Sequence, residues 1–247
     1  MSKDLFSSHA SDYALYRPSY PPELIEYIAS LCKNHDIALD CATGNGQAAV
    51  LLSKHFKQVI GTDLSKDQIA VAKQLPNISY RVSPAESTPF SDNTFDLITI
   101  AQAYHWVKHD EFAKEIKRIG KPGAIIAVWG YNLFKSSNGQ VTKLIDDFYY
   151  NVTDPYWEPE RKFIESNYET APFEFAEIKP EKKFRMIVHW SADQVEGYLN
   201  TWSAIKKFIK INNYNPISEL MQNVRKAWGN NEKIEFEFPL PLRIGKL

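Results

Sequence analysis

The chain has 247 residues, of which 44% are hydrophobic and 24% are charged, a composition typical of a soluble globular protein. Its 29 Lys and Arg residues nearly balance its 30 Asp and Glu residues, and the formal net charge of -1 argues against a broad nucleic-acid-binding surface. Only two cysteines are present, Cys32 and Cys41, which excludes a disulfide framework and a thiolate zinc site.

The first residues, Met1-Ser-Lys-Asp-Leu-Phe, contain no apolar signal core. The longest apolar runs, such as 97–101 and 124–129, are far too short to cross a bilayer. We therefore expect a cytoplasmic protein that binds neither a membrane nor nucleic acid.

Short apolar runs alternate with helical patterns between residues 21 and 130. A helix is expected to start at Pro21-Pro22, because proline suits a first helical turn and apolar residues follow at helical spacing. Strands are then predicted at 37–41, 59–63, 78–82, 95–101 and 124–130. Helices are predicted between them at 47–55, 65–75 and 110–119.

This alternation indicates a doubly wound α/β fold, in which a mostly parallel sheet is covered by helices on both faces. The ligands of such folds bind at the carboxyl ends of the strands. We therefore expect residues 21–130 to form the cofactor-binding core, with residues 1–20 as an N-terminal closing segment.

The second half of the chain has a different texture. Residues 131–180 are rich in aromatic residues and proline, with a helix predicted at 141–150, and we interpret them as a helical lid over the sheet edge. Residues 181–247 are expected to add C-terminal helices and edge strands to the same single domain, 1–247. The patterns predict a strand at 183–190, helices at 192–211 and 216–228, and an edge strand at 234–244, because edge strands tolerate proline.

The most informative segment is a glycine-containing turn between a predicted strand and a predicted helix, Asp40-Cys-Ala-Thr-Gly44-Asn-Gly46. Gly44 and Gly46 allow positive backbone torsions and let a ligand approach the backbone closely. The backbone amides at the start of the helix would face that ligand. A tight structural turn would also need glycine. Gly44-x-Gly46-x-x-Ala49 even satisfies the relaxed dinucleotide pattern, so an NAD(P)-dependent oxidoreductase remains an alternative.

Three acidic residues help to distinguish a ligand-binding turn from a purely structural turn and from a dinucleotide site. Asp40, just before the turn, would repel a pyrophosphate and suit a cationic group such as a sulfonium or an ammonium. Asp63 ends the next predicted strand, where a carboxylate could accept both hydroxyls of a ribose. Glu86 follows Ala85 after the third predicted strand, where the edge of an adenine could be read.

At these positions the sequence resembles the class I S-adenosylmethionine-dependent methyltransferases. The acid-x-Gly-x-Gly loop of that family matches the segment from Asp40 to Gly46 with one extra residue, and Ala48 stands where a third glycine is common. The segments 6–21, 101–106 and 199–203 resemble a narrower branch, which includes trans-aconitate methyltransferase-like small-molecule O-methyltransferases.

The resemblance implies S-adenosylmethionine as the cofactor and a seven-stranded Rossmann-like sheet with an antiparallel edge strand. It implies that Gly44 and Gly46 lie beside the methionine moiety, above Asp40, and that Asp63 holds the ribose. The remaining contacts that it implies come from Leu64 on the adenine face, Ala85 and Glu86 on the adenine edge, Ala101 and Gln102 on the methionine side, and Tyr13, Tyr16 and Arg17 closing from the N-terminal segment.

The expected reaction is in-line transfer of the activated methyl group to a carboxylate or hydroxyl of a small molecule. A carboxylate needs no base, whereas a hydroxyl does, and His105 is the candidate base because an unperturbed histidine titrates near neutrality. Trp106, Trp129 and Tyr131 are candidate walls of the acceptor pocket. Each of these residues has a simpler interpretation as packing. No metal site is expected. We expect the protein to be a monomer or a homodimer.

Two further alternatives stay open. A methyltransferase acting on nucleic acid or protein is one, although the Asn/Asp-Pro-Pro-Tyr/Phe run of DNA and RNA amino-methylating relatives is replaced here by Ala101-Gln-Ala-Tyr-His. A binding module that keeps the fold without catalysis is the other.

Overall fold

A computed structural model gives the structure of residues 16–247. The predicted contact of Tyr13, and most of the predicted closing segment, lie outside these described residues.

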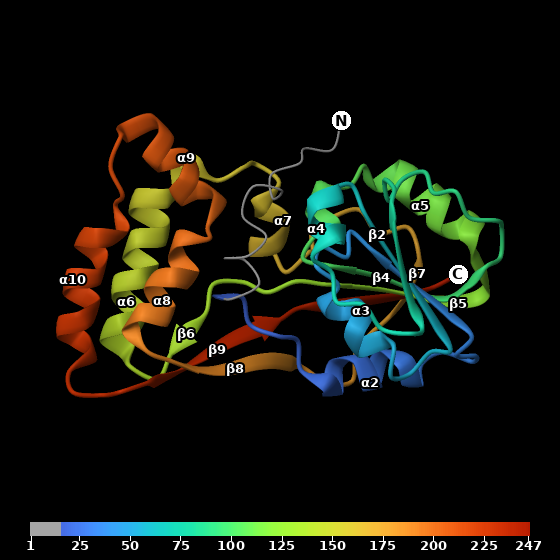
Figure 1. Ribbon diagram of the computed structural model, residues 1–247, viewed down its shortest axis with the longest axis horizontal. Coiled ribbons are helices and arrows are strands. Elements are labelled where there is room, and N and C mark those ends of the chain that lie inside the picture. Colours follow the sequence, from blue (N-terminus) through green and yellow to red (C-terminus); the bar gives the residue numbers. More distant parts are fainter. Residues whose placement is uncertain (1–15) are drawn as a thin grey trace.

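The centre of the structure is a seven-stranded sheet with the order β3-β2-β1-β4-β5-β10-β7 (Figure 1). The strands β1 to β5 run parallel to one another, whereas β10 is antiparallel both to β5 and to β7. This confirms the predicted doubly wound, mostly parallel sheet. The strands are β1 (Ile37–Cys41), β2 (Gln58–Asp63), β3 (Ile78–Val82), β4 (Phe95–Ala101), β5 (Gly120–Trp129), β7 (Ala176–Ile178) and β10 (Leu242–Lys246).

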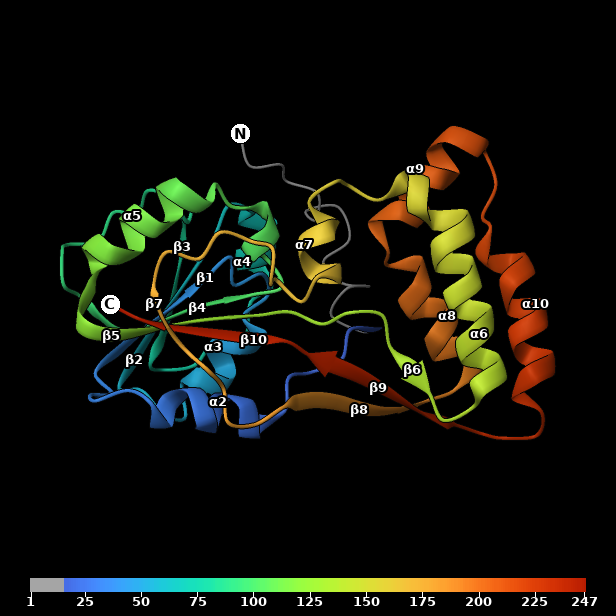
Figure 2. The ribbon, with the colours of Figure 1, turned by 180° about the vertical axis from the view of Figure 1, so that it is seen from behind.

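Helices cover both faces of this sheet (Figures 1 and 2). On one face, Leu97 packs in a cluster with the apolar residues of α2 (Pro22–Ser30) and α3 (Gln47–Leu52). On the other face, Ile98 and Ile100 pack with α5 (His109–Ile119). Because successive side chains of a strand point to opposite faces, a strand covered on both sides is apolar throughout. Because β4 is buried on both faces, its largely apolar run predicts a strand from the sequence.

A second group of elements, which we term the helical lobe, extends from the carboxyl ends of the strands (Figure 1). It contains a three-stranded antiparallel sheet in the order β6-β9-β8 and a group of helices beyond it. Its elements are β6 (Lys135–Ser136), α6 (Gly139–Phe148), β8 (Phe184–Trp190), α8 (Ala192–Asn200), α9 (Ser203–Asn212), α10 (Ile217–Trp228) and β9 (Ile234–Leu240).

Short helical turns lie between the lobe and the main sheet. A π-turn at Tyr149–Thr153 and a 3-10 turn at Asp154–Tyr156 follow α6 and lead toward α7 (Arg161–Glu165). In both views α7 lies between the lobe and the sheet (Figures 1 and 2). The predicted lid comprises residues 131–180. Its first part belongs to the lobe, together with residues 184–240, whereas its last strand, β7, belongs to the main sheet.

The predicted helix 192–211 is wrong as a single element, because it is divided between α8 and α9. Trp202 has an extended backbone at this break (φ -68°, ψ 132°), and its ring lies 5.7 Å from Tyr149 and 5.5 Å from Trp157 between centroids. These contacts with distant parts of the chain accompany a break that helical spacing alone does not reveal.

The predicted edge strand 234–244 is also wrong, because two strands in two sheets take its place. β9 is the central strand of the small sheet, and β10 lies between β5 and β7. Pro241 separates them, and its carbonyl accepts the backbone N–H of Gly130 at 3.3 Å. The predicted helices 47–55 and 65–75 end earlier, as α3 at Leu52 and as α4 (Lys66–Ala70).

Candidate active site

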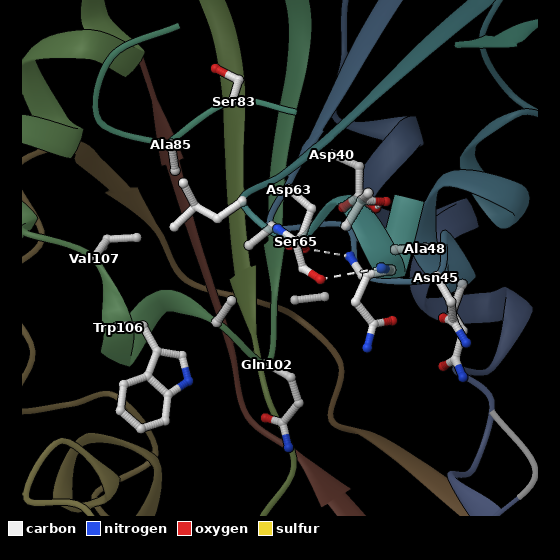
Figure 3. A pocket seen from close by; sticks show the side chains of 18 of the residues that line it. Asp40, Asn45, Ala48, Asp63, Ser65, Ser83, Ala85, Gln102, Trp106 and Val107 are labelled. Atoms are coloured by element: carbon white, nitrogen blue, oxygen red, sulfur yellow. Dashed lines mark hydrogen bonds between the residues drawn. The ribbon is translucent and has the colours of Figure 1, made fainter. Parts of the chain in front are cut away.

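A cavity of about 170 Å³ lies at the carboxyl ends of β1, β2 and β4 (Figure 3). We term it the outer cavity. Trp106 and Val107 lie across it from Asp40 (Figure 3). Most of the predicted site residues line this one cavity: Arg17, Asp40, Gly44, Asp63, Leu64, Ala85, Glu86, Ala101, Gln102, Trp106 and Tyr131.

The turn between β1 and α3 needs glycine for two separate reasons. Gly44 (φ 56°) and Gly46 (φ 84°) both have left-handed backbones, which favour glycine. A Cβ on Gly46 would also lie 2.3 Å from the hydroxyl oxygen of Tyr80. Gly46 therefore lets the turn pack against β3, whereas Gly44 lines the cavity.

Asp40 is a buried acid beneath this turn, with 1% of its surface exposed. Its carboxylate accepts hydrogen bonds from the hydroxyls of Thr43, at 2.5 Å, and Thr99, at 2.8 Å. Burial raises the pKa of Asp40 to about 6, although the two hydroxyls oppose the shift by stabilising the anion. At neutral pH this group is a negative charge under the cavity floor.

Asp63 connects two backbone segments at the end of β2. Its Oδ2 accepts the N–H of Gly44 at 2.8 Å, and its Oδ1 accepts the N–H of Ser65 at 2.8 Å. Ser65 in turn caps α4, because its Oγ accepts the N–H of Gln68 at 3.2 Å. Through these bonds the Asp63 carboxylate, which lines the cavity, joins the glycine turn to the start of α4.

Leu64 and Ala85 add apolar surface to the cavity lining. Leu64 is 42% exposed and therefore accessible to a ligand in the cavity. Glu86 also lines it, while its Oε1 accepts the backbone N–H of Lys108 at 3.1 Å.

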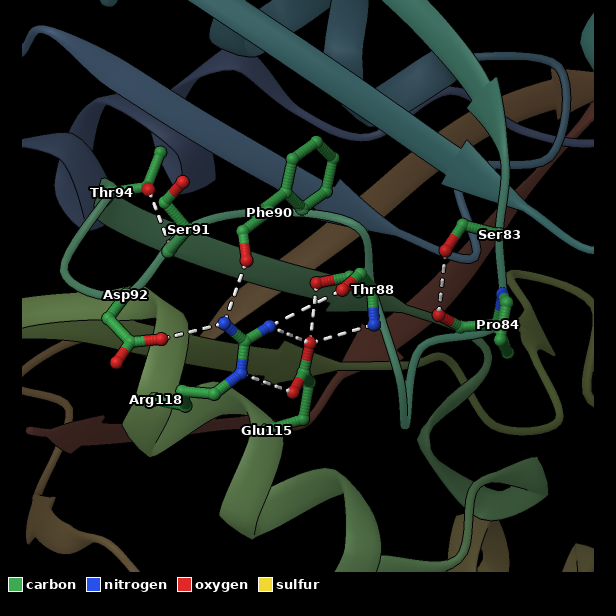
Figure 4. Close-up of polar contacts among 9 residues, drawn as sticks. All are labelled: Ser83, Pro84, Thr88, Phe90, Ser91, Asp92, Thr94, Glu115 and Arg118. Atoms are coloured by element: carbon green, nitrogen blue, oxygen red, sulfur yellow. Dashed lines mark hydrogen bonds and ion pairs between the residues drawn. The ribbon is translucent and has the colours of Figure 1, made fainter.

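The connection from β3 to β4, which has no long helix, is held by two side chains of α5 (Figure 4). Glu115 is 8% exposed, and its Oε1 accepts the backbone N–H of Thr88 at 2.7 Å and the Thr88 hydroxyl at 2.5 Å. Arg118 donates to Glu115, to the carbonyl of Phe90 at 2.7 Å and to Asp92 at 2.8 Å. This network fixes the loop that carries Ala85 and Glu86.

A smaller cavity, of about 60 Å³, adjoins the outer one on the side of the helical lobe. We term it the inner cavity. Both cavities are lined by Arg17, Gln102, Trp106 and Tyr131, so these residues mark their junction. The inner cavity is also lined by His105, Trp157, Glu158, Arg161, Ile164, Tyr198, Trp202 and Ser203.

Sequence reasoning did not single out Trp157, Arg161 or Tyr198 as functional residues. They come from the segment around α7 and from α8, which are far from the glycine turn in the sequence. Trp202 and Ser203 lie in the segment 199–203 that resembles the narrower branch, and this resemblance is the sequence signal for that part of the inner cavity.

His105 is 6% exposed and lines the inner cavity rather than the outer one. Its Nδ1 lies 3.1 Å from the hydroxyl of Tyr168. Burial, and then the positive charge of Arg161, lower the pKa of His105 to about 3. The imidazole is therefore neutral near pH 7, and it is a weak base.

Three predicted site residues of the described chain line neither cavity: Gly46, which packs against Tyr80, and also Trp129 and Tyr16. Trp129 is fully buried, with its ring 5.5 Å from Tyr20 in an edge-on arrangement, so it is a core residue and not a wall of the acceptor pocket. Tyr16 does not line either cavity. Its ring packs on α8, where a Cβ on Gly197 would lie 2.4 Å from it.

Residues 16–247 contain neither a candidate membrane span nor a candidate metal cluster. No helix in this part of the chain is both long and apolar enough to span a membrane. The same residues contain no cluster of three or more His, Cys, Asp or Glu side chains suited to holding a metal ion.

The sheet order, the turn between β1 and α3 and the acid at the end of β2 define a Rossmann-like α/β protein with its ligand site at the strand ends. Comparisons with known proteins narrow this class. The family model described as "Methyltransferase domain" matches residues 39–128.

Relatives extend this match to nearly the whole chain. A Dictyostelium discoideum protein classed as a methyltransferase is 34% identical over 256 residues, which cover 98% of this chain and 95% of that protein. A solved structure from Anaeromyxobacter dehalogenans, classed as a type II methyltransferase, has a TM-score of 0.87 and 33% identity over 94% of this chain and 98% of that one. An uncharacterised methyltransferase-like protein of Schizosaccharomyces pombe is 32% identical over half of each chain.

The chain belongs to the class I S-adenosylmethionine-dependent methyltransferases, and S-adenosylmethionine is its cofactor. These matches do not favour the alternative of an NAD(P)-dependent oxidoreductase.

Proposed function

We propose that this methyltransferase transfers the methyl group to an oxygen of a small-molecule acceptor held in the inner cavity. The observation that carries the proposal is the junction between the cavities, where Arg17, Gln102, Trp106 and Tyr131 line both. A donor in the outer cavity and an acceptor in the inner one would meet there. The volume of about 60 Å³ favours a small molecule over a polymer.

The lining of the outer cavity fits the cofactor. The exposed side chain of Leu64 offers an apolar surface to an adenine ring, with Ala85 and Glu86 at its edge. We assign the ribose hydroxyls to Asp63, whose carboxylate lines the cavity at the end of β2, and the buried charge of Asp40 complements a sulfonium or an ammonium group. We assign the methionine side to Gly44, Ala101, Gln102 and Arg17.

The sulfonium supplies an already activated methyl group, so the residues of this chain have to align the acceptor and exclude water. Trp106 and Tyr131 serve as walls at the junction. Water is excluded by an inner cavity whose walls include Trp157, Ile164 and Trp202.

The state of His105 favours a carboxylate acceptor over a hydroxyl. An efficient general base has a pKa near the working pH, whereas the pKa of His105 is lowered to about 3. A carboxylate is already ionised near neutrality and needs no base. Within the proposal, His105 is a neutral polar group on the acceptor side, and the narrower resemblance to trans-aconitate methyltransferase-like enzymes agrees with a carboxylate.

The proposal is tested by incubating the protein with methyl-labelled S-adenosylmethionine and a fractionated metabolite extract. We expect label in a small molecule, released as methanol by mild alkali, as a methyl ester is. Label that resists alkali would indicate an ether or an N-methyl product and would contradict the carboxylate assignment. Label only in protein or nucleic acid would contradict the small-molecule assignment.

A further inference from the structure

Arg161, the first residue of α7, is fixed in an unusual way. Its Nε donates to the hydroxyl of Tyr149 at 2.9 Å, and that hydroxyl donates to Oε1 of Glu165 at 2.6 Å. The guanidinium also lies over Trp157, with 4.4 Å between its Cζ and the ring centroid. The stack and the Nε bond together restrict the orientation of the side chain.

The two terminal nitrogens of Arg161 are not used in this arrangement. Within the described part of the chain, neither Nη1 nor Nη2 has a hydrogen-bond or ion-pair partner. The partly buried guanidinium is thus held through its Nε and through one face, which stacks on Trp157. The N–H groups of Nη1 and Nη2 remain as donors for a ligand. Such a fork matches the two oxygens of a carboxylate or a phosphate.

A second arginine lies in the same lining as Arg161. Arg17 lines the same cavity, with its Nη1 donating to the Tyr131 hydroxyl at 2.8 Å. Among the described lining residues the one acid is Glu158, whose Oε1 lies 3.5 Å from Nζ of Lys207. Two arginines and one acid thus belong to the described lining of the inner cavity, and that acid lies beside a lysine.

The position of Arg161 separates it from the reacting centre. The junction of the cavities is lined by Arg17 and three other residues. Arg161, in contrast, lines only the inner cavity and not the outer one. A group bound to Arg161 would thus lie on the side away from the methyl donor.

We propose that Arg161 binds an anionic group of the acceptor, a carboxylate or a phosphate, that is not itself methylated. This inference rests on the proposed function and adds a second requirement for the acceptor. The acceptor is then a small molecule with the reacting oxygen at the junction and a retained negative charge at its far end. Arg161 is its specificity-determining residue.

A binding measurement tests the site without turnover. Malonate and inorganic phosphate are titrated into the complex with S-adenosylhomocysteine, and tryptophan fluorescence is followed because Trp157 lies under the guanidinium. We expect a saturable change that is lost in Arg161→Gln and weakened in Arg161→Lys, which keeps the charge without the fork. Arg185→Gln is the matched control, since Arg185 is an exposed residue of β8 paired with Glu237. Equal responses of Arg161→Gln and Arg185→Gln would overturn the proposal.

The labelled product provides a second test. We expect it to bind an anion-exchange resin at pH 7, and phosphatase treatment separates a retained phosphate, which it removes, from a retained carboxylate. Arg161→Gln should lower kcat/KM about 10- to 100-fold, mainly through the KM of the acceptor, with unchanged S-adenosylhomocysteine affinity. A labelled product that is neutral or cationic would overturn this inference alone, whereas alkali-resistant label would contradict the proposed function.

Discussion

The side-chain amide of Gln102 binds both polar groups of the Tyr131 backbone. Its Oε1 accepts the Tyr131 N–H at 3.0 Å, and its Nε2 donates to the Tyr131 carbonyl at 3.2 Å. The end of β4 is thereby joined to the segment that leaves β5 for the helical lobe. Gly130 makes this possible, because a Cβ there would lie 2.5 Å from the same amide oxygen.

Replacing Gln102 with Leu should therefore affect both stability and the acceptor site. The Tyr131 N–H and carbonyl would lose their partner, which should lower the free energy of unfolding by about 2 kcal/mol and raise the acceptor KM. Urea unfolding and steady-state kinetics measure the two effects. Asn132→Leu is the control, since that amide donates only to the exposed Asn167, at 2.7 Å. Equal effects of the two substitutions would refute the role of Gln102.

Asp63→Ala should weaken S-adenosylhomocysteine binding about 10-fold or more. The change removes the acceptor for Gly44 and Ser65, so both the turn and the proposed ribose contact are lost. Calorimetric titration measures the affinity. Asp67→Ala, an exposed acid in the first turn of α4, should bind like the wild type. Unchanged affinity in Asp63→Ala would remove Asp63 from the cofactor site.

The affinity for S-adenosylmethionine should rise between pH 5 and pH 7. Burial raises the pKa of Asp40 to about 6, and only the ionised form attracts a cation. Binding below pH 6 should release a proton, which calorimetry in buffers of different ionisation enthalpy detects. In the unliganded protein the same raised pKa stabilises the fold at low pH, and this contribution is lost as the pH rises through about 6. A pH dependence that persists in Asp40→Asn would contradict this account.

At saturating cofactor, kcat/KM for the acceptor should be flat between pH 6 and pH 9. With a pKa lowered to about 3, His105 is neutral throughout this range, and a carboxylate acceptor is ionised. His105→Asn, which keeps polar character, should retain most of the rate. A wild-type rate that rises with an apparent pKa of 6 to 7 and is lost in this variant would instead identify His105 as a base.

Glu115→Ala should destabilise the fold by about 3 kcal/mol. The change leaves the Thr88 N–H without its acceptor and removes the carboxylate that pairs with Arg118. Burial raises the pKa of Glu115, but the bonds from Arg118 and Thr88 outweigh it and lower that pKa overall, so this stabilisation should be lost only at acidic pH. Asp92→Ala removes an exposed partner of the same arginine and should cost less than about 1 kcal/mol. Chemical unfolding of the two variants gives the comparison.

The central strands β1 and β4 were predictable because burial on both faces makes them short and largely apolar runs. The ranges 37–41, 78–82 and 95–101 agree with β1, β3 and β4 to the residue. The outer cavity was predictable for a related reason. Asp40 and Asp63 end neighbouring parallel strands, and the carboxyl ends of such strands meet at one edge of the sheet.

The inner cavity was not predictable from such local patterns. Trp157, Arg161 and Tyr198 line one cavity only because the fold brings the segment around α7 together with α8, and no spacing in the sequence encodes that arrangement. Trp129 illustrates the opposite error. An aromatic residue at a strand end looks like a cavity wall, but the ring of Tyr20 covers it. Side-chain direction at strand ends depends on tertiary packing.

A crystal structure of the complex with S-adenosylhomocysteine tests the central claim most directly. The account predicts the ligand in the outer cavity, with ribose hydroxyls on Asp63, the adenine against Leu64 and the sulfur facing the junction with the inner cavity. A ligand bound elsewhere, or one with its sulfur directed away from that junction, would contradict it.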